Sequence, residues 1–309
     1  MGLRYAALTL LLLLAGCAGA PRAGPAPRLY LAGIRELWII DTGTGRVRHE
    51  HRAELAPGDP PHMILARGRR IVMGAPFGDR AFFLPSARPD RVWVVDLRPG
   101  GDVLGVREVT VDGETTVPAT RPPTRRWPVG AVADGVLLPT GDDGLEVWNP
   151  QADRVVRRLR VGPGLTGPVS AGIVTACEDP CAELQLVDAH TGAARMIRAP
   201  THLVFDPWSG AFSPSGDLLA VGIRAIGDPE TTLCRLALID VRSGRVAVVP
   251  GSEAPPGYTL LAWSASGRYV FMTGGDRGKR RVIVGYRLGT RHAERLNVHV
   301  GDFYDIAAV

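Results

Sequence analysis

Few residues of this chain have the types and spacing that catalysis or metal binding requires. His49 and His51 alternate along one strand-like segment, but two ligands without a third partner are a weak metal site. Asp142 and Asp143 precede Gly144 without the alternating oxygen ligands of a calcium loop, so a hairpin turn explains them better. The sequence has no nucleophile elbow, zinc-protease helix, phosphate-binding loop or dinucleotide fingerprint. We therefore predict no catalytic residue, no metal site and no cofactor.

Cysteine offers clearer chemistry, at the end of an N-terminal export signal. Arg4 precedes the apolar run Ala6 to Ala15, which has signal-peptide length and is too short to span a bilayer. The run closes on Leu14-Ala15-Gly16-Cys17, where small side chains admit a peptidase and the thiol can accept lipid. This segment resembles the lipobox of bacterial lipoproteins. The resemblance implies cleavage before Cys17 and a thioether-linked diacylglycerol on its sulfur.

The N-terminal pattern divides the chain into three expected parts. Residues 1–16 are the signal peptide, residues 17–28 are the lipidated cysteine and an Ala/Gly/Pro-rich tether, and residues 29–309 are the folded domain. Two or three acyl chains anchor a protein stably, so we expect a palmitate-bearing lipoprotein on the extracytoplasmic face of the cell membrane. An ordinary signal peptide followed by an incidental cysteine is the alternative.

Export changes the chemistry expected of the other cysteines, because thiols outside the cytoplasm are normally oxidised when geometry permits. Cys177 and Cys181 frame the turn residues Glu178-Asp179-Pro180, so a disulfide that pins this hairpin is the first expectation. A metal site is less favoured, since two thiolates with no nearby histidine are an incomplete ligand set. Cys234 is expected to be buried and free, although a bridge between Cys181 and Cys234 is a competing pairing.

One strand-like phrase recurs along the chain and predicts the fold. Each copy is an aliphatic run that stops before a turn, and the copies end at Asp41, Asp96, Asn149, Asp188 and Asp240. This spacing suits a four-stranded propeller blade with loops of variable length. β-Branched and aromatic residues dominate between Gly, Pro and Asp punctuation, so we predict an all-β fold with essentially no helix after residue 17.

A second phrase precedes the first in two of the units. Residues 211–221 and 262–272 align as an inner strand, a tight Ser-Gly turn and a second strand. This pair resembles the WD-like repeat of TolB-type propellers, with Ser215 and Ser266 at the position of the turn aspartate. The Asp-Thr-Gly turn of the first phrase resembles the repeat of YVTN-type surface propellers. These resemblances imply a β-propeller and leave the function open, because propellers serve many functions.

The two ends of the domain predict how the ring closes. Residues 29–33 match the second strand of a blade, and residues 303–308 match a first strand with nothing after it. Pairing them completes one blade and leaves no unprotected edge. The remaining units lie near residues 62–111, 127–161, 167–200, 208–250 and 258–300. We therefore predict a six-bladed propeller, or seven blades if residues 112–128 contain a strand pair.

The repeated residues themselves favour structural roles. Hydrogen bonds from side chain to backbone within turns explain the recurrent aspartates at strand ends, Asp96 included. Trp38 and Trp93 occupy matching positions in their strands and are expected to pack between adjacent sheets. A binding site must therefore be sought where the repeats differ.

The residues around the start of each inner strand differ most and converge on one mouth of the central tunnel. They combine aromatic rings with a few charges, which suits a peptide, a glycan or a small amphiphile. The alternative is that the aromatic rings only pack under loops. The residues that we predict to bind are Arg126, Trp127, Asp206, Trp208, Tyr258, Asp302 and Tyr304.

Charge narrows the class of partner. The formal net charge is +5, and removal of residues 1–16, whose only charged residue is Arg4, leaves +4, which does not imply nucleic acid. We predict contact with the membrane through the N-terminal lipid, and an envelope protein, peptide or glycan as ligand. The expected role is a binding or protein-assembly platform. A lyase or hydrolase acting at the same mouth is the alternative, and a purely structural member of an envelope complex is a third possibility.

Overall fold

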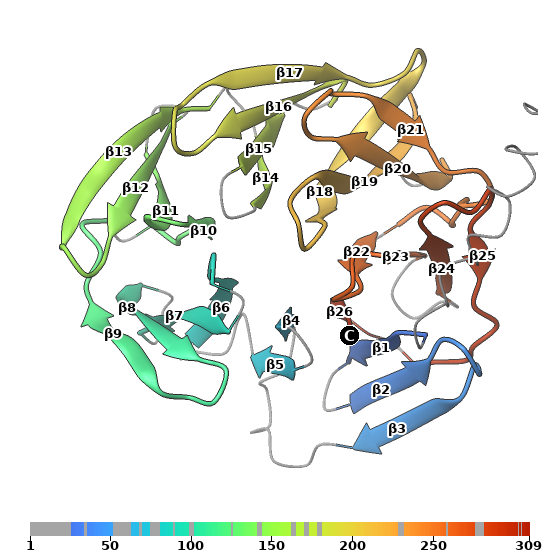
Figure 1. Cartoon of the computed structure of the whole chain (residues 1–309), viewed down its shortest axis with the longest axis horizontal. Helices are drawn as coiled ribbons and strands as arrows, with labels where there is room; N and C mark the ends of the chain where they lie inside the picture. The colour runs from blue at the N-terminus through green and yellow to red at the C-terminus, as the bar shows by residue number, and fades with distance from the viewer. Residues whose placement is uncertain are drawn as a thin grey trace, which may run out of the picture.

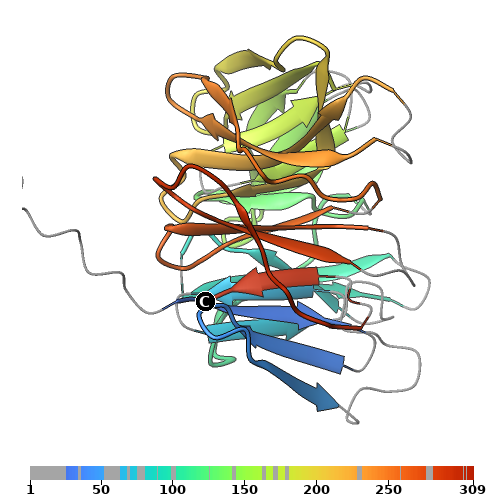
Figure 2. The same cartoon turned by 90° about the vertical axis from the view of Figure 1, so that its right-hand side faces the viewer.

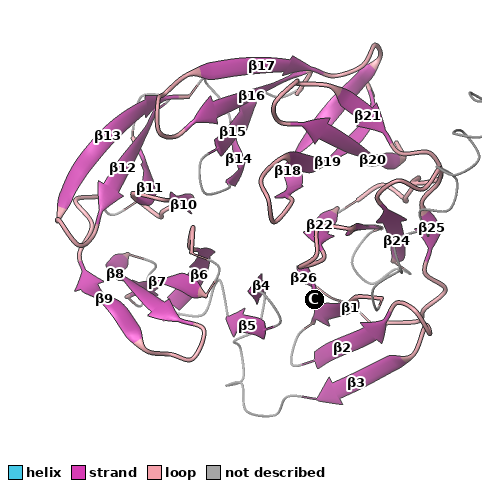
Figure 3. Cartoon of the chain, in the orientation of Figure 1, coloured by secondary structure: helices cyan, strands magenta, loops and turns pink. Residues whose placement is uncertain are grey.

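The computed structural model consists of strands and loops, and the residues that it describes contain no helix (Figure 3). No helical segment there has the length and hydrophobicity that crossing a bilayer requires. The all-β prediction is confirmed for this part of the chain. The described residues are 26–33, 36–51, 63–67, 70–74, 81–88, 90–98, 102–124, 126–140, 144–161, 165–169, 173–177, 181–227, 232–257, 259–275, 281–301, 303 and 305–309.

In the described part of the chain, six four-stranded sheets surround a central axis, which confirms the six-bladed arrangement (Figure 1). The blade that both chain ends share contains β26 (Asp305–Ala308), β1 (Arg28–Ala32), β2 (Glu36–Asp41) and β3 (Val47–His51). The second contains β6 (Ala81–Pro85), β7 (Arg91–Leu97), β8 (Val103–Thr110) and β9 (Thr115–Thr120). The third contains β10 (Gly130–Val132), β11 (Gly135–Pro139), β12 (Gly144–Asn149) and β13 (Arg154–Arg160).

The other three blades follow in chain order around the ring. The fourth contains β14 (Leu165–Val169), β15 (Ile173–Cys177), β16 (Glu183–Asp188) and β17 (Ala194–Arg198). The fifth contains β18 (Leu203–Phe212), β19 (Leu218–Ala225), β20 (Cys234–Asp240) and β21 (Val246–Val248). The sixth contains β22 (Leu260–Trp263), β23 (Tyr269–Gly274), β24 (Val282–Arg287) and β25 (Glu294–Arg295).

A two-stranded sheet stands between the shared blade and the second blade. Its strand β4 (Met63–Arg67) pairs with β5 (Arg70–Gly74) and contacts the inner strands β26 and β6 on its two sides. The predicted unit at residues 62–111 is therefore divided, and the second blade takes its outer strand β9 from residues 112–128. The sequence pattern specifies strands but not their places in a sheet, so it could not separate this hairpin from the blade.

The ring closes as the two ends of the domain predict. β1 pairs with β2 on one side and with β26 on the other, both antiparallel, so the C-terminal strand is the inner strand of the shared blade. Arg28 and Val309 exchange two backbone hydrogen bonds, with N···O distances of 2.8 and 2.9 Å. The first and last strands of the domain thus belong to one sheet.

The antiparallel pairing gives the ring two distinct faces. First and third strands begin on one face, which we call the front face, and they end on the other, which we call the rear face (Figure 2). β1 is a second strand, so Arg28 begins on the rear face beside the end of β26. The chain therefore joins the ring from the rear.

The turns on the rear face confirm the structural role of most recurrent aspartates. The Oδ1 atom of Asp41 accepts hydrogen bonds from the amides of Gly43 and Thr44 at 3.1 and 2.9 Å. Asp188 and Asp240 form equivalent bonds to the residues that follow them. Backbone donors at Thr44, Thr191 and Ser243 respectively are the largest causes of a lowered pKa at these three carboxyls.

Asp96 differs from these three aspartates in its place in the blade. It ends β7, which is the second strand of its blade, and it therefore lies on the front face. Its Oδ2 atom accepts a 3.0 Å hydrogen bond from Nε of Arg107 in the adjacent strand. Asp96 thus forms an ion pair across two strands, and residues 99–101 of the turn that follows lie outside the described residues.

The hydrophobic core lies between neighbouring blades. Trp38 is 5% exposed and belongs to a cluster that joins the shared blade to Phe271 of the sixth. Trp93 is 7% exposed and belongs to a cluster that joins the second blade to Trp148 of the third. Both tryptophans pack between sheets as predicted, although Trp38 lies in a third strand and Trp93 in a second strand.

A buried carboxylate holds the rear end of the second blade together. Glu108 is 4% exposed and accepts hydrogen bonds from Ser86 Oγ at 2.6 Å, Arg91 Nη1 at 3.1 Å and Thr116 Oγ1 at 3.0 Å. Burial raises the pKa of this carboxyl, but the three donors outweigh burial and the pKa is lowered from its ordinary value. The charged form is therefore the one that the fold stabilises.

Replacement of this carboxylate should give an acid-dependent loss of stability. A pKa lowered on folding adds stability above the ordinary carboxyl pKa, and that stability is lost as the pH falls through the folded-state pKa. We expect Glu108→Gln to cost about 1–3 kcal/mol at pH 7 and progressively less toward pH 3. Urea unfolding across this pH range measures the difference, with exposed Glu114→Gln as the control. A cost independent of pH would contradict the prediction.

Ring closure predicts that the C-terminal strand carries much of the stability. Ile306 is 4% exposed in the core between the shared and sixth blades, so Ile306→Ala should lower the free energy of unfolding by about 2–4 kcal/mol. Met196 is 51% exposed on β17, and Met196→Ala should change the free energy of unfolding by about 0.5 kcal/mol or less. Deletion of Asp305–Val309 should cost more than Ile306→Ala. Equal urea midpoints for all these proteins would show that the closing strand is dispensable.

Candidate functional site

Two predicted binding residues lie directly before the inner strand of the third blade. Arg126 and Trp127 precede β10 on the front face of the ring. The exposed Arg126 guanidinium donates a 2.7 Å hydrogen bond from Nη1 to the carbonyl oxygen of Thr140. Trp127 is 37% exposed. Both side chains are therefore accessible from solvent on the face where the sequence placed the site.

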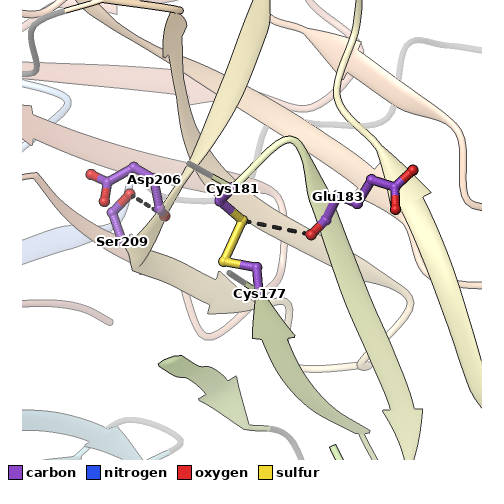
Figure 4. Close-up of a disulfide and its surroundings, with 5 residues drawn as sticks. All are labelled: Cys177, Cys181, Glu183, Asp206 and Ser209. Carbon is purple, nitrogen blue, oxygen red and sulfur yellow. Dashed lines mark hydrogen bonds between the residues drawn. A yellow bond between two sulfur atoms is a disulfide. The ribbon is translucent and has the colours of Figure 1, made fainter. Parts of the chain in front are cut away.

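Asp206 and Trp208 lie within the inner strand β18 and do not precede it. The pairing of β18 with β19 shifts register between Asp206 and Gly210, so the intervening residues bulge out of the ladder. Ser209 Oγ donates a 3.3 Å hydrogen bond to the Asp206 carbonyl oxygen (Figure 4). The same oxygen of Ser209 accepts a 3.1 Å hydrogen bond from the amide of Gly222. Asp206 is half-buried. The side chain of Trp208 is outside the described part of the structure.

The other three predicted residues, Tyr258, Asp302 and Tyr304, lie outside the described residues and stay predictions. The residue between the last two, Phe303, is fully buried, and the guanidinium carbon of Arg281 lies 4.5 Å from its ring centroid. Arg281 is 6% exposed and directly precedes a third strand, so a cation and an aromatic ring stack near the front ends of two blades. The sequence prediction missed this arginine, and the basic run that ends at Arg281 was the available signal.

Exposed apolar side chains gather on the front face. Leu104 is 48% exposed near the start of a third strand, and Val129 is 37% exposed just before a first strand. Ile226 and Leu233 are 65% and 52% exposed and flank the connection between β19 and β20. Trp127 belongs to the same set. Single exposed apolar residues are ordinary, but several on one face of a ring mark a surface suited to a partner.

A cavity opens on the front face of the second blade. Its volume is about 410 Å³, and it lies where β7 and β9 end and β8 begins. Pairing is irregular on both sides of β8, with register shifts next to Asp96 and between Val106 and Glu108. The cavity is lined by residues at the ends of these three strands: Asp96, Leu97, Leu104, Gly105, Ala119, Thr120 and Arg121.

The structure contains a disulfide between Cys177 and Cys181, with Cα atoms 5.5 Å apart (Figure 4). It joins the end of β15 to the residues before β16 on the front face. The amide of Phe205 in the next blade donates a 2.8 Å hydrogen bond to the Cys181 carbonyl. Cys234 is free and buried, which agrees with the first expectation for this thiol and not with a Cys181 to Cys234 bridge.

Of the residues considered for metal binding, His49 has other contacts. His49 lies on the outer strand β3 and stacks on Trp38, with ring centroids 5.4 Å apart. Its Nε2 atom is 3.7 Å from Oε1 of Glu36. In the part of the chain that the structure describes, no group of three His, Cys, Asp or Glu is placed to hold a metal ion. Asp142 and Asp143 lie outside that part.

Comparison with known proteins identifies the architecture. TolB from Acinetobacter baumannii superposes with a TM-score of 0.55 at 14% identity, over 97% of this chain and 71% of that protein. A putative 6-phosphogluconolactonase from Bacteroides fragilis gives 0.54 at 14% identity, over 94% of this chain and 100% of the other. This chain has the β-propeller fold. No protein-family model and no curated protein matches the sequence.

A WD40 propeller is also among the similar structures. The WD40 domain of Pan2 from Neurospora crassa gives a TM-score of 0.54 at 11% identity, over 86% of this chain and 87% of that domain. Similarity to TolB and to a WD40 domain agrees with the repeat patterns in the sequence. At these identities the similarity concerns the fold alone, because propellers with unrelated functions share it.

The reactivity of the free thiol of Cys234 tests whether this side chain is buried in the fifth blade. Burial is the largest cause of a raised pKa at Cys234, which reaches about 11, so the reactive thiolate is scarce at pH 8. We expect the folded wild type and Cys234→Ala to react equally with a thiol reagent at pH 8. In denaturant, the wild type should show one thiol more than the variant. If the folded wild type reacts fast at pH 8 and folded Cys234→Ala does not, Cys234 is not buried and the prediction is wrong.

Proposed function

We propose that this protein is a lipid-anchored β-propeller that serves as a binding or protein-assembly platform on the extracytoplasmic side of the cell membrane. The ligand or partner binds the front face of the ring. The observation that carries this proposal is the concentration of exposed large apolar residues on that face, from Leu104 and Trp127 to Leu233. Arg126 adds a charged group at the same surface.

The path of the chain supports the proposed arrangement. The domain joins the ring at Arg28 on the rear face, and the Ala/Gly/Pro-rich tether of residues 17–28 leads there from Cys17. A lipid on Cys17 would therefore pull on the rear of the ring and leave the front face directed away from the bilayer. A partner in the extracytoplasmic space could then reach the apolar residues without displacing the anchor.

The anchoring half of the proposal is tested at the modified residue. Metabolic labelling with palmitate should mark the wild-type protein, and Cys17→Ala should remove the label and release the protein from the membrane fraction. Cys234→Ser is the matched control, since a buried thiol on the fifth blade should not affect lipid transfer. Equal labelling of wild type and Cys17→Ala would disprove the anchor.

The binding half is tested by comparing the two faces of the ring. Trp127→Ala and Leu233→Asp alter the front face, whereas Val47→Asp alters an apolar residue that is 39% exposed at the rear. In cells that express the full chain, front-face variants should lose cross-linked partner roughly tenfold or more, and the rear variant should retain it. Retention by both front-face variants, or equal loss from Val47→Asp, would place the binding surface elsewhere.

A further inference from the structure

We infer that the cavity of the second blade is a separate binding site for a small aliphatic carboxylate. It lies among the second, third and outer strands of one blade, away from the inner strands that surround the tunnel, and none of the predicted binding residues lines it. The inference does not depend on lipid anchoring or on the proposed platform role. It rests on the shape, the lining and the charge of the cavity.

The shape follows from how the three strands diverge. Asp96 pairs with Gly105 and Leu97 pairs with Val103, so Leu104 is an extra residue that has no partner position in β7. On the other side of β8, the register with β9 shifts across Pro118, which has no amide hydrogen to donate. Bulges on both sides of one strand separate the ladder at the front end. The resulting space of about 410 Å³ lies within the range of small-molecule sites, roughly 300–1,000 Å³.

Apolar residues form most of the lining, and Thr120 is its uncharged polar residue. Leu97 is 7% exposed and belongs to the blade core, whereas Leu104 is 48% exposed beside the opening. Gly105 and Ala119 face each other, because a Cβ atom built on Gly105 would lie 3.6 Å from that of Ala119. Side chains of ordinary size at these two positions would occupy the space. An aliphatic body of a few carbons therefore fits the cavity better than a polar one.

The charge of the cavity favours an anion. Two charged residues line it, Asp96 and Arg121, and Asp96 is already bonded to Arg107 at 3.0 Å. Arg121 is exposed, and within the described residues no carboxylate lies at salt-bridge distance from its guanidinium. An arginine fork matches the geometry of a carboxylate and binds it more strongly than a neutral group. A ligand with its carboxylate at Arg121 and its aliphatic chain between Leu97, Leu104 and Ala119 matches both the charge and the apolar residues of the cavity.

The probe for this site is octanoate, with octanol and octyltrimethylammonium as neutral and cationic analogues of the same chain length. Titration calorimetry uses the full chain, and the same titrations without protein supply the reference. We expect octanoate to bind more tightly than either analogue. Equal affinity for all three, or no binding of octanoate, would overturn the inference. Tighter binding of octyltrimethylammonium would also overturn the inference, and it would mean that Asp96, not Arg121, decides which charge the cavity binds.

Three variants separate the contributions of charge and shape. Arg121→Gln should weaken octanoate binding roughly tenfold to a hundredfold and leave octanol unchanged. Gly105→Leu should abolish binding of octanoate and of octanol, because the leucine side chain would occupy the cavity. Ala119→Leu is a second variant that fills the cavity, for use if Gly105→Leu does not fold. Arg154→Gln, on the exposed outer strand of the third blade, is the control and should change nothing. Octanoate affinity that survives both Arg121→Gln and a folded filling variant would disprove the site.

Discussion

The pairing of β26 with β1 is the contact on which the rest of the ring depends. A propeller made of sequential sheets has two ends, and an open end would expose both a strand edge and the apolar side of a blade. Here the C-terminal strand completes the N-terminal blade, and Phe303 and Ile306 are buried against the sixth blade as a result. The antiparallel order within each blade gives the ring its front and rear faces, and closure joins the first and last blades into one ring.

The two faces of the ring then take different roles for physical reasons. On the rear face, turns such as Asp41 to Gly45 bond their own backbone through side-chain oxygens, which makes short and self-sufficient connections. On the front face, the described residues include the exposed apolar set, the cavity of the second blade and the Arg281–Phe303 stack. Short rear turns give the scaffold its regularity. The front face carries the features that differ from blade to blade.

The parts of the fold that the sequence predicts are those encoded by local contacts. Strand runs that end in Asp188 or Asp240 are recognisable because the aspartate bonds amides only two or three residues later. Ring closure was also predictable, since the N-terminal unit lacked its inner strand and the C-terminal end offered a first strand with nothing after it. Cys177 and Cys181 are four positions apart and frame a turn, so a disulfide between them could be predicted. Each of these features depends on residues close in the sequence or on a simple count of strands.

The features that the sequence did not predict depend on pairing between strands. Asp96 looks like the other aspartates, but its partner Arg107 becomes visible only once β7 and β8 are aligned. Leu104 is exposed because the ladder skips it, and no local pattern marks a skipped residue. The hairpin β4–β5 carries the same strand pattern as a blade, so its separation from the second blade is a property of packing. Tyr258, Asp302 and Tyr304 stay predictions of the sequence.

Native-state hydrogen exchange of the closing strand tests ring closure most directly. If both chain ends form one blade, the amides of Arg28 and Val309 and the paired amides of β1 and β26 should exchange through global unfolding. Their opening free energy should then equal that of the central strand β19 and fall with denaturant at the same slope. Exchange of β26 through a local opening that is insensitive to denaturant, while β19 stays protected, would contradict the stabilising role of ring closure.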